Sequence, residues 1–130
     1  YEKAAKQGFA AAQRNLGGMY SLGRGVVRSD VIAAKWYGLA AAQGDAGAQC
    51  NLAWLYANGT GLDKDIPLAV HWYQAAATQG HPEALFSLGV MTVEGRGTKQ
   101  DEQLGRRYIR QAAEQGLEPA RAWLELAARR

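Results

Sequence analysis

Hydrophobic and small residues recur along this chain with a period of 36 residues. One alanine and one leucine position are occupied in four successive copies: Ala12, Ala48, Ala84 and Ala120, then Leu16, Leu52, Leu88 and Leu124. Glycines recur in the same register at Gly23, Gly59 and Gly95, at Gly25, Gly61 and Gly97, and at Gly8, Gly44, Gly80 and Gly116. So many agreements at one spacing indicate an internal repeat, which constrains the fold before any single element does.

Within one unit the apolar positions follow the period of an α-helix twice. In the second unit, one set has spacing i, i+4, i+7, i+8 and a later set has i, i+3, i+4, i+7: Ala48, Leu52, Leu55 and Tyr56, then Ala69, Trp72, Tyr73 and Ala76. Each set places its members on one face of a helix, so a unit is expected to be a helix pair. The pattern predicts helices at residues 1–7, 10–22, 30–43, 46–58, 66–79, 82–94, 102–115 and 118–129.

Polar and small residues at the predicted helix ends support these boundaries. Ser29, Asp65 and Asp101 are 36 residues apart and precede the second helix of each unit, where a side-chain oxygen can accept from free first-turn amides. Asp45 has the same role before a first helix, and Pro82 suits a first turn. The glycine pairs are expected to end the first helices, because glycine adopts positive φ without a Cβ clash.

A single helix pair of 36 residues cannot bury enough apolar surface to offset the entropy of ordering it, so the units are expected to stack. The sequence therefore predicts an all-α fold, an α-α superhelix (solenoid) of stacked antiparallel helix pairs with an extended concave groove. One domain over residues 1–130 would contain the tail of a preceding repeat (1–8), full repeats (9–44, 45–80 and 81–116) and one further first helix (117–130). Gly105 replaces a helix-favouring alanine, so the third unit is expected to be looser.

Composition is that of an ordinary globular domain, with 48% hydrophobic and 21% charged residues. No apolar run approaches the roughly 20 residues that span a bilayer. The one cysteine, Cys50, excludes an internal disulfide and a cysteine-based zinc site, and it is expected to be an inert small hydrophobe. Net charge is +3, and arginines such as Arg106 and Arg110 alternate with glutamates, so a solvated face is favoured and no nucleic acid partner is expected.

Candidate catalytic residues do not assemble into a recognisable site. His71 and His81 lack a second histidine or a carboxylate at ligand spacing, and neither Ser21 nor Ser87 lies in a pattern that would activate a nucleophile. The Gly-Arg-Gly turns lack the lysine and the spacing of a phosphate loop. The chain is therefore predicted not to be an enzyme and to need no metal or cofactor.

The repeated motifs resemble a known family. "AAQRNLGGMYSLGRGV" at 11–26, followed by "AAKWYGLAAAQG" at 33–44, is similar to the Sel-one-like repeat, a relative of the tetratricopeptide repeat. This resemblance implies a noncatalytic adaptor that binds a protein or peptide, and the alanine and arginine usage indicates a bacterial source. The absence of cysteine pairs makes a disulfide-rich secreted member unexpected, and the choice between periplasm and cytoplasm stays open. Because the chain opens like the tail of a second helix and closes on an unpaired first helix, we expect a fragment of a longer array.

The resemblance also implies which residues line the groove. Transferred from tetratricopeptide geometry, the groove positions are Arg14, Asn15 and Gly18 in the first unit, Cys50, Asn51, Trp54 and Asn58 in the second, and Phe86, Ser87, Val90 and Val93 in the third. Trp54, Phe86, Val90 and Val93 are expected to form one contiguous apolar stripe inside a polar rim, the composition of an interface hot spot. The alternative is that Trp54 fills the gap between neighbouring first helices.

Two other functions remain open from the sequence. The resemblance to bacterial repeat proteins allows an immunity-type protein that binds and neutralises one effector enzyme. A structural spacer without any ligand is the third possibility.

Overall fold

The computed structural model describes residue 5 and residues 8–129, and within them it contains helices and no strand. Seven helices are described there: α2 (Ala10–Leu22), α3 (Asp30–Ala42), α4 (Ala46–Asn58), α5 (Ile66–Thr78), α6 (Pro82–Glu94), α7 (Glu102–Glu114) and α8 (Glu118–Ala128). The predicted bounds of α2, α4 and α6 are confirmed, and the other four helices end one residue earlier than predicted. The predicted helix at 1–7 lies outside the described residues except for Ala5, which is helical.

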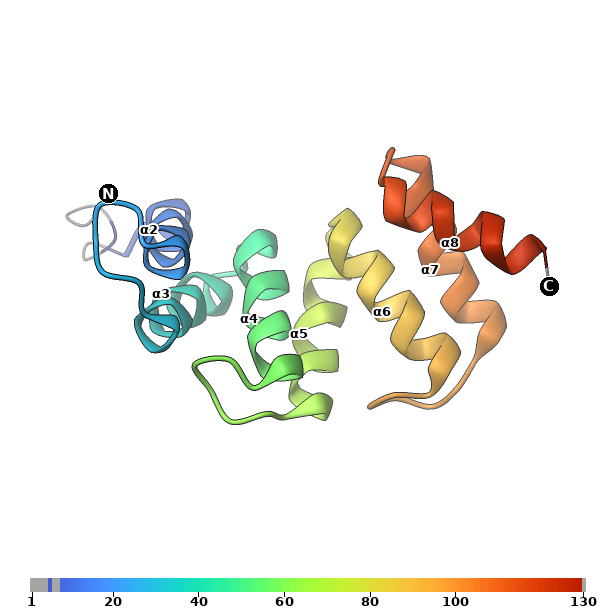
Figure 1. The fold of residues 1–130 in the computed structure, drawn as a ribbon, viewed down its shortest axis with the longest axis horizontal. Coiled ribbons are helices and arrows are strands. Elements are labelled where there is room, and N and C mark those ends of the chain that lie inside the picture. Colours follow the sequence, from blue (N-terminus) through green and yellow to red (C-terminus); the bar gives the residue numbers. More distant parts are fainter. Residues whose placement is uncertain (1–4, 6–7, 130) are drawn as a thin grey trace.

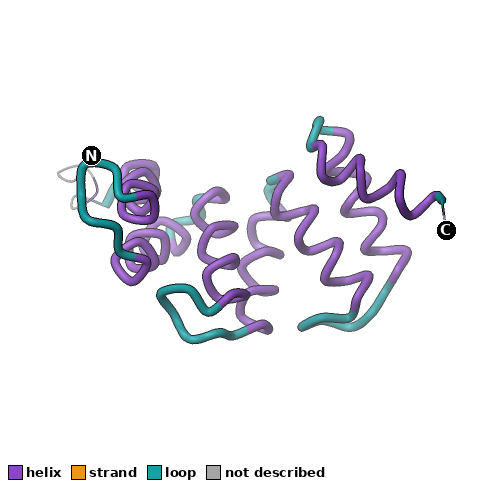
Figure 2. The backbone as a smooth tube through the Cα atoms, in the orientation of Figure 1, coloured by secondary structure: helices purple, strands orange, loops and turns teal. Residues whose placement is uncertain are grey.

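The helices stack in the order of the sequence, so the predicted all-α solenoid is confirmed. Each helix packs mainly against the one before it and the one after it. Figure 1 shows the pairs following one another from α2 and α3 at one end to α7 and α8 at the other. Short connections join the helices (Figure 2). Contacts between sequence neighbours alone are typical of repeat solenoids.

The expected helix caps are present. The side chains of Ser29, Asp65 and Asp101 accept from the backbone amides three residues later, at 3.2, 3.1 and 3.0 Å. Asp45 accepts from the Ala48 amide at 2.9 Å, and Pro82 lies in the first turn of α6. Local sequence therefore fixes where these helices begin.

The paired glycines end the first helices and also bring neighbouring units together. Gly61 and Gly97 have φ of 73° and 74°, a left-handed conformation that favours glycine. A Cβ at Gly61 would overlap the backbone carbonyl of Asp30, at the start of the preceding second helix. A Cβ at Gly97 would lie 2.9 Å from Val70 Cγ2, on α5. Gly61 and Gly97 are thus required by both the turn and the contact between units.

The expectation that Gly105 loosens the third unit is wrong. Gly105 is buried, and a Cβ there would lie 2.5 Å from Val93 Cγ2 and 2.6 Å from the Gly89 carbonyl oxygen. Two facing glycines let α6 and α7 approach backbone to backbone. Close packing at this point outweighs the low helix propensity of glycine.

Candidate protein-binding surface

The surface formed by α2, α4, α6 and α8, here called the first-helix face, carries two hollows. The N-terminal hollow, of about 350 Å³, is lined by Ser21, Leu22, Arg28, Asp30, Tyr37, Asn51, Trp54, Leu55 and Thr60. The C-terminal hollow, of about 440 Å³, is lined by Ala57, Asn58, Tyr73, Phe86, Ser87, Val90, Met91, Glu94, Arg96 and Trp123.

The two hollows are the same site repeated one unit later. Seven lining residues of the C-terminal hollow stand 36 positions after a lining residue of the N-terminal one: Ala57, Asn58, Tyr73, Ser87, Val90, Met91 and Arg96 after Ser21, Leu22, Tyr37, Asn51, Trp54, Leu55 and Thr60. The solenoid therefore presents one backbone frame twice. Different side chains at equivalent positions give the two hollows different chemistry.

A tyrosine from the second helix lies at the floor of each hollow. Tyr37 and Tyr73 are 6% and 4% exposed and reach between two first helices, beside Ser21 and Ser87 respectively. Burial raises the pKa of both phenols, and the serine hydroxyls act in the opposite direction. Both phenols are therefore protonated at neutral pH and offer a hydroxyl group beneath each hollow.

The structure divides the predicted groove residues between these hollows. Asn51 and Trp54 line the N-terminal hollow, whereas Asn58 lines the C-terminal one together with Phe86, Ser87 and Val90. The members of the expected apolar stripe thus belong to two hollows, in which Trp54 and Val90 occupy equivalent positions. Trp54 is 53% exposed, so it is not an interior residue filling the gap between first helices.

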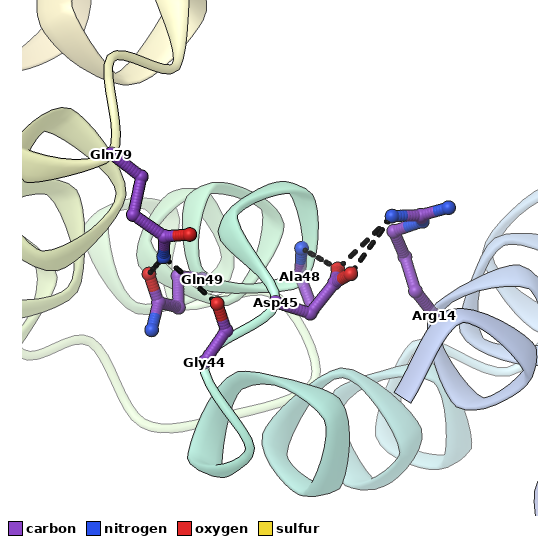
Figure 3. A network of polar contacts seen from close by, with 6 residues as sticks. All are labelled: Arg14, Gly44, Asp45, Ala48, Gln49 and Gln79. Atoms are coloured by element: carbon purple, nitrogen blue, oxygen red, sulfur yellow. Dashed lines mark hydrogen bonds and ion pairs between the residues drawn. The ribbon is translucent and has the colours of Figure 1, made fainter. Parts of the chain in front are cut away.

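The predicted residues of the first unit lie around a neighbouring depression. Arg14, Asn15 and Gly18 line it together with Asn51, and its volume is about 280 Å³. Arg14 is not free, because its Nη1 lies 2.9 Å from Asp45 Oδ1 (Figure 3). Asp45 also caps α4, so this ion pair joins the first unit to the second.

Contrary to the prediction, Cys50 is buried and Val93 lines neither hollow. Cys50 is 8% exposed and belongs to the core between α4, α5 and α6, because Tyr73 and Met91 pack around it. Burial, followed by the charge of Glu83, raises the pKa of its thiol to about 12, so it stays protonated at neutral pH. The half-buried Val93 faces Gly105 on α7 and contributes to packing between these helices.

Sequence reasoning missed several residues of the C-terminal hollow. The pattern predicts Tyr73 only as part of a helix face and Arg96 only as part of a Gly-Arg-Gly turn, whereas the register puts Trp123 at a groove position. The signal was present in the register, since Trp123 lies 72 positions after Asn51 and 36 after Ser87. A repeat register therefore identifies lining positions that a comparison within one unit does not.

A chain of glutamines between units was also missed. Gln79 Nε2 donates to Gln49 Oε1 at 3.1 Å and to the Gly44 carbonyl at 2.8 Å (Figure 3). Gln49 Nε2 in turn donates to the Ala41 carbonyl at 3.2 Å. The recurrence of glutamine at 43, 79 and 115 could have indicated it. These bonds are structural: Gln49 joins α4 to the preceding α3, and Gln79 joins the end of α5 to α4 and to Gly44 of the first unit.

Among residues 5 and 8–129, no group of three or more His, Cys, Asp or Glu side chains is arranged to hold a metal ion. None of the helices described is long and apolar enough to cross a bilayer.

Solved structures show the same arrangement. A Sel1 repeat protein from Oxalobacter formigenes is 42% identical with a TM-score of 0.86, over 92% of this chain and 49% of that one. The protective antigen c5321 of uropathogenic Escherichia coli, which displays an SLR fold, is 36% identical with a TM-score of 0.88, over 92% and 26%. Cysteine rich protein B of Helicobacter pylori shares the fold at 21% identity, with a TM-score of 0.71 over 92% of both chains.

The family comparison covers nearly every residue. The chain spans about half the length of the Oxalobacter protein, and no curated protein matches it. The sequence model of the Sel1 repeat matches residues 1–9, 10–45, 46–81, 82–117 and 119–130. Repeated matches over almost the whole sequence, with a solved relative at 42% identity, place this chain in the Sel1 repeat family.

Proposed function

We propose that this chain is a noncatalytic scaffold that binds a protein or peptide on its first-helix face, with Trp54 as the main anchor. Sel1 repeat proteins are generally protein-interaction scaffolds without catalysis. The observation that carries the proposal is the exposure of Trp54, 53%, in the wall of a hollow that Asn51 and Thr60 also line. Aromatic side chains beside polar groups are the usual anchors of protein interfaces.

The helix that carries Trp54 is firmly held, which favours binding. Asp45 caps the start of α4, and Asn58 Nδ2 donates to the Trp54 carbonyl oxygen at 2.8 Å near its end. Leu52 and Leu55, on the same helix, are buried in the core. A surface that is already ordered loses little conformational entropy when a partner binds.

The test is an affinity capture with the wild-type chain and with Trp54→Ala, followed by calorimetry on the purified captured protein. A matched control is Leu39→Ala, because Leu39 is an exposed apolar residue of α3, outside the first-helix face, at 44% exposure. We expect Trp54→Ala to weaken binding by about tenfold or more, a hot-spot effect, and Leu39→Ala to leave it unchanged.

Thermal unfolding of both variants separates binding from folding. We expect both to unfold close to the wild-type temperature, because neither side chain is buried. Unchanged affinity of Trp54→Ala would refute the proposal. So would a loss of several kcal/mol in its stability, since Trp54 would then act in folding.

A further inference from the structure

The C-terminal hollow combines apolar walls with one cation at its mouth. Phe86, Val90 and Trp123 form the walls, and each is half-buried. The equivalent of Val90 in the N-terminal hollow is the bulky Trp54, and the equivalent of Arg96 is the neutral Thr60. The C-terminal hollow is therefore the larger of the two, about 440 against 350 Å³, and the one with a charged group at this position.

Arg96 is held at the mouth by its backbone. It follows Gly95, whose left-handed conformation ends α6, and its amide donates to the Met91 carbonyl at 2.9 Å. Its side chain is exposed, and no ion pair within the described residues involves it. Burial raises the pKa of Tyr73, whereas the Arg96 charge acts in the opposite direction, as expected for a cation that faces the same hollow as the phenol.

The other charges near the hollow are placed differently. The Arg106 guanidinium lies 5.7 Å from the ring centroid of Trp123 and also pairs with Glu102 at 2.9 Å. Its charge is thus already compensated, and it holds one face of the indole. Glu94 is exposed at the end of α6, on the rim. Arg96 is the cation that lines the hollow and has no partner among the described residues.

We infer that the C-terminal hollow binds a peptide segment that carries an apolar side chain next to a carboxylate. The apolar side chain packs between Phe86, Val90 and Trp123, and the carboxylate pairs with Arg96. Arginine binds carboxylates through two parallel hydrogen bonds, which fix the orientation of the carboxylate and add to the affinity. This inference rests on the proposed function, of which it defines one specific subsite.

Defined peptides test the inference directly. The probes are the blocked hexapeptide Ser-Ala-Leu-Asp-Ala-Ser and two relatives, one with Asn for Asp and one with Ser for Leu. Tryptophan indole N–H resonances of the ¹⁵N-labelled chain report the position of binding. Trp123 reports the C-terminal hollow, Trp54 the N-terminal one, and Trp72 a hollow between α3 and α5. We expect the Leu-Asp peptide to shift Trp123 saturably and each relative to bind about threefold or more weakly.

Two charge variants make the test specific. Arg96→Gln should remove the difference between the Asp and Asn peptides, whereas the control Arg24→Gln, in the equivalent Gly-Arg-Gly turn of the first unit and outside this hollow, should preserve it. Equal binding of the Asp and Asn peptides to the wild type would overturn the inference, as would the absence of a Trp123 shift or a shift confined to Trp72.

Failure of this subsite can be told apart from failure of the proposed function. If Trp123 does not respond while a captured protein still requires Trp54, the subsite is wrong and the scaffold function stands. If Trp123 responds with the expected Asp preference while capture ignores Trp54, the subsite stands and the proposed anchor is wrong.

Discussion

The first helix pair (α2, α3) and the third (α6, α7) share one backbone plan but are held together differently. In the first pair an aromatic ring fills the interface, because a Cβ at Gly17 would lie 2.8 Å from Tyr37 Cδ1. In the third pair two glycines face each other, and a Cβ at Gly89 would lie 2.8 Å from the Gly105 carbonyl oxygen. The two helices of a unit can thus pack either with an aromatic ring against one glycine or with two glycines that bring the backbones together.

The contact of each pair with the preceding unit also differs. Gln13 Nε2 donates to the Ala5 carbonyl at 3.1 Å and Gln13 Oε1 accepts from Gln43 at 2.7 Å, whereas the equivalent of Gln13 in the third pair is Leu85, which is buried. In the described part of the chain no buried side-chain polar atom lacks a hydrogen-bond partner. One repeat position can therefore hold either an apolar side chain or a polar one, provided that a buried polar side chain has hydrogen-bond partners.

The largest expected difference between the first and third pairs is in their stability at alkaline pH. Burial raises the pKa of Tyr37, in the first pair, above 10.0, and in the second pair it raises the pKa of Tyr73 above 10.0 and that of the Cys50 thiol from 9.0 to about 12. As pH rises above about 9, the unfolded chain releases protons that the folded chain retains, so the free energy of unfolding falls. The third pair has Phe86 and Ile109 at the equivalent positions, and these do not ionise.

Fluorine NMR of 5-fluorotryptophan in the labelled chain measures this difference between pH 8 and 12. We expect the signal of Trp36, in the first pair, to change at lower pH than that of Trp123, which packs on the third. Tyr37→Phe should move the Trp36 transition to higher pH. Simultaneous transitions, unaffected by Tyr37→Phe, would contradict the account.

A methyl group at Gly105 should have the next largest effect. Gly105→Ala places a Cβ 2.5 Å from Val93 Cγ2 and 2.8 Å from the Val93 backbone nitrogen, and backbone cannot move aside as a flexible side chain can. We expect it to lower the free energy of unfolding by about 1–3 kcal/mol in urea denaturation, although alanine is the better helix former.

The control for that change lies in the first pair. Gly38, on α3, has no atom within 4 Å of the position a Cβ would take. Gly38→Ala should therefore raise the free energy of unfolding by about 0.5–1 kcal/mol through helix propensity alone. A stabilising Gly105→Ala would show that α6 and α7 can separate without cost, and the contrast between the two pairs would not hold.

Replacing the polar residue Gln49 by the leucine found at the equivalent position 85 should have an intermediate effect on the free energy of unfolding. Gln49→Ala removes the donor to the Ala41 carbonyl and leaves a void, so we expect a loss of about 1–3 kcal/mol. Gln49→Leu copies Leu85 and keeps most of the volume, and the Ala41 carbonyl retains its bond from the Gly44 amide. We expect a loss below about 1 kcal/mol. Equal losses in chemical denaturation would show that the hydrogen bond, rather than the filled space, is what matters.

Most of the fold could be predicted from the sequence because its determinants are local. Helix bounds follow from caps such as Asp65 and from glycines that must adopt positive φ, and stacking follows from the 36-residue register. The consequence of Gly105 could not be predicted in this way. Helix propensity belongs to one residue, whereas the close contact depends on Gly89 lying opposite.

The candidate surface was less predictable for a related reason. Register places Trp54 and Val90 on the same side of successive helices, but it does not say whether one continuous groove connects them. The same holds for Cys50. Tetratricopeptide geometry predicts that it faces the groove, whereas its packing with Tyr73 buries it in the core. The repeat pattern determines the direction in which a side chain leaves its helix. The sizes of the neighbouring side chains determine how much of it remains exposed.

The smallest expected effect concerns the cap of α6. Asp45 caps α4, whereas its equivalent, His81, makes no side-chain cap bond although its backbone is similar, φ −65° and ψ 119° against −70° and 113°. Introducing the missing acceptor as His81→Asp should stabilise the third pair by about 0.5–1 kcal/mol relative to His81→Ala, because free amides remain at the start of α6 and both variants lose the contact of His81 Nε2 with Glu83 Oε2 at 3.1 Å. The gain should not exceed that, because Cys50 occupies the position from which Arg14 pairs with Asp45. Urea denaturation of His81→Asp beside His81→Ala isolates the cap, and equal midpoints would mean that Pro82 already fixes this helix start without a side-chain acceptor.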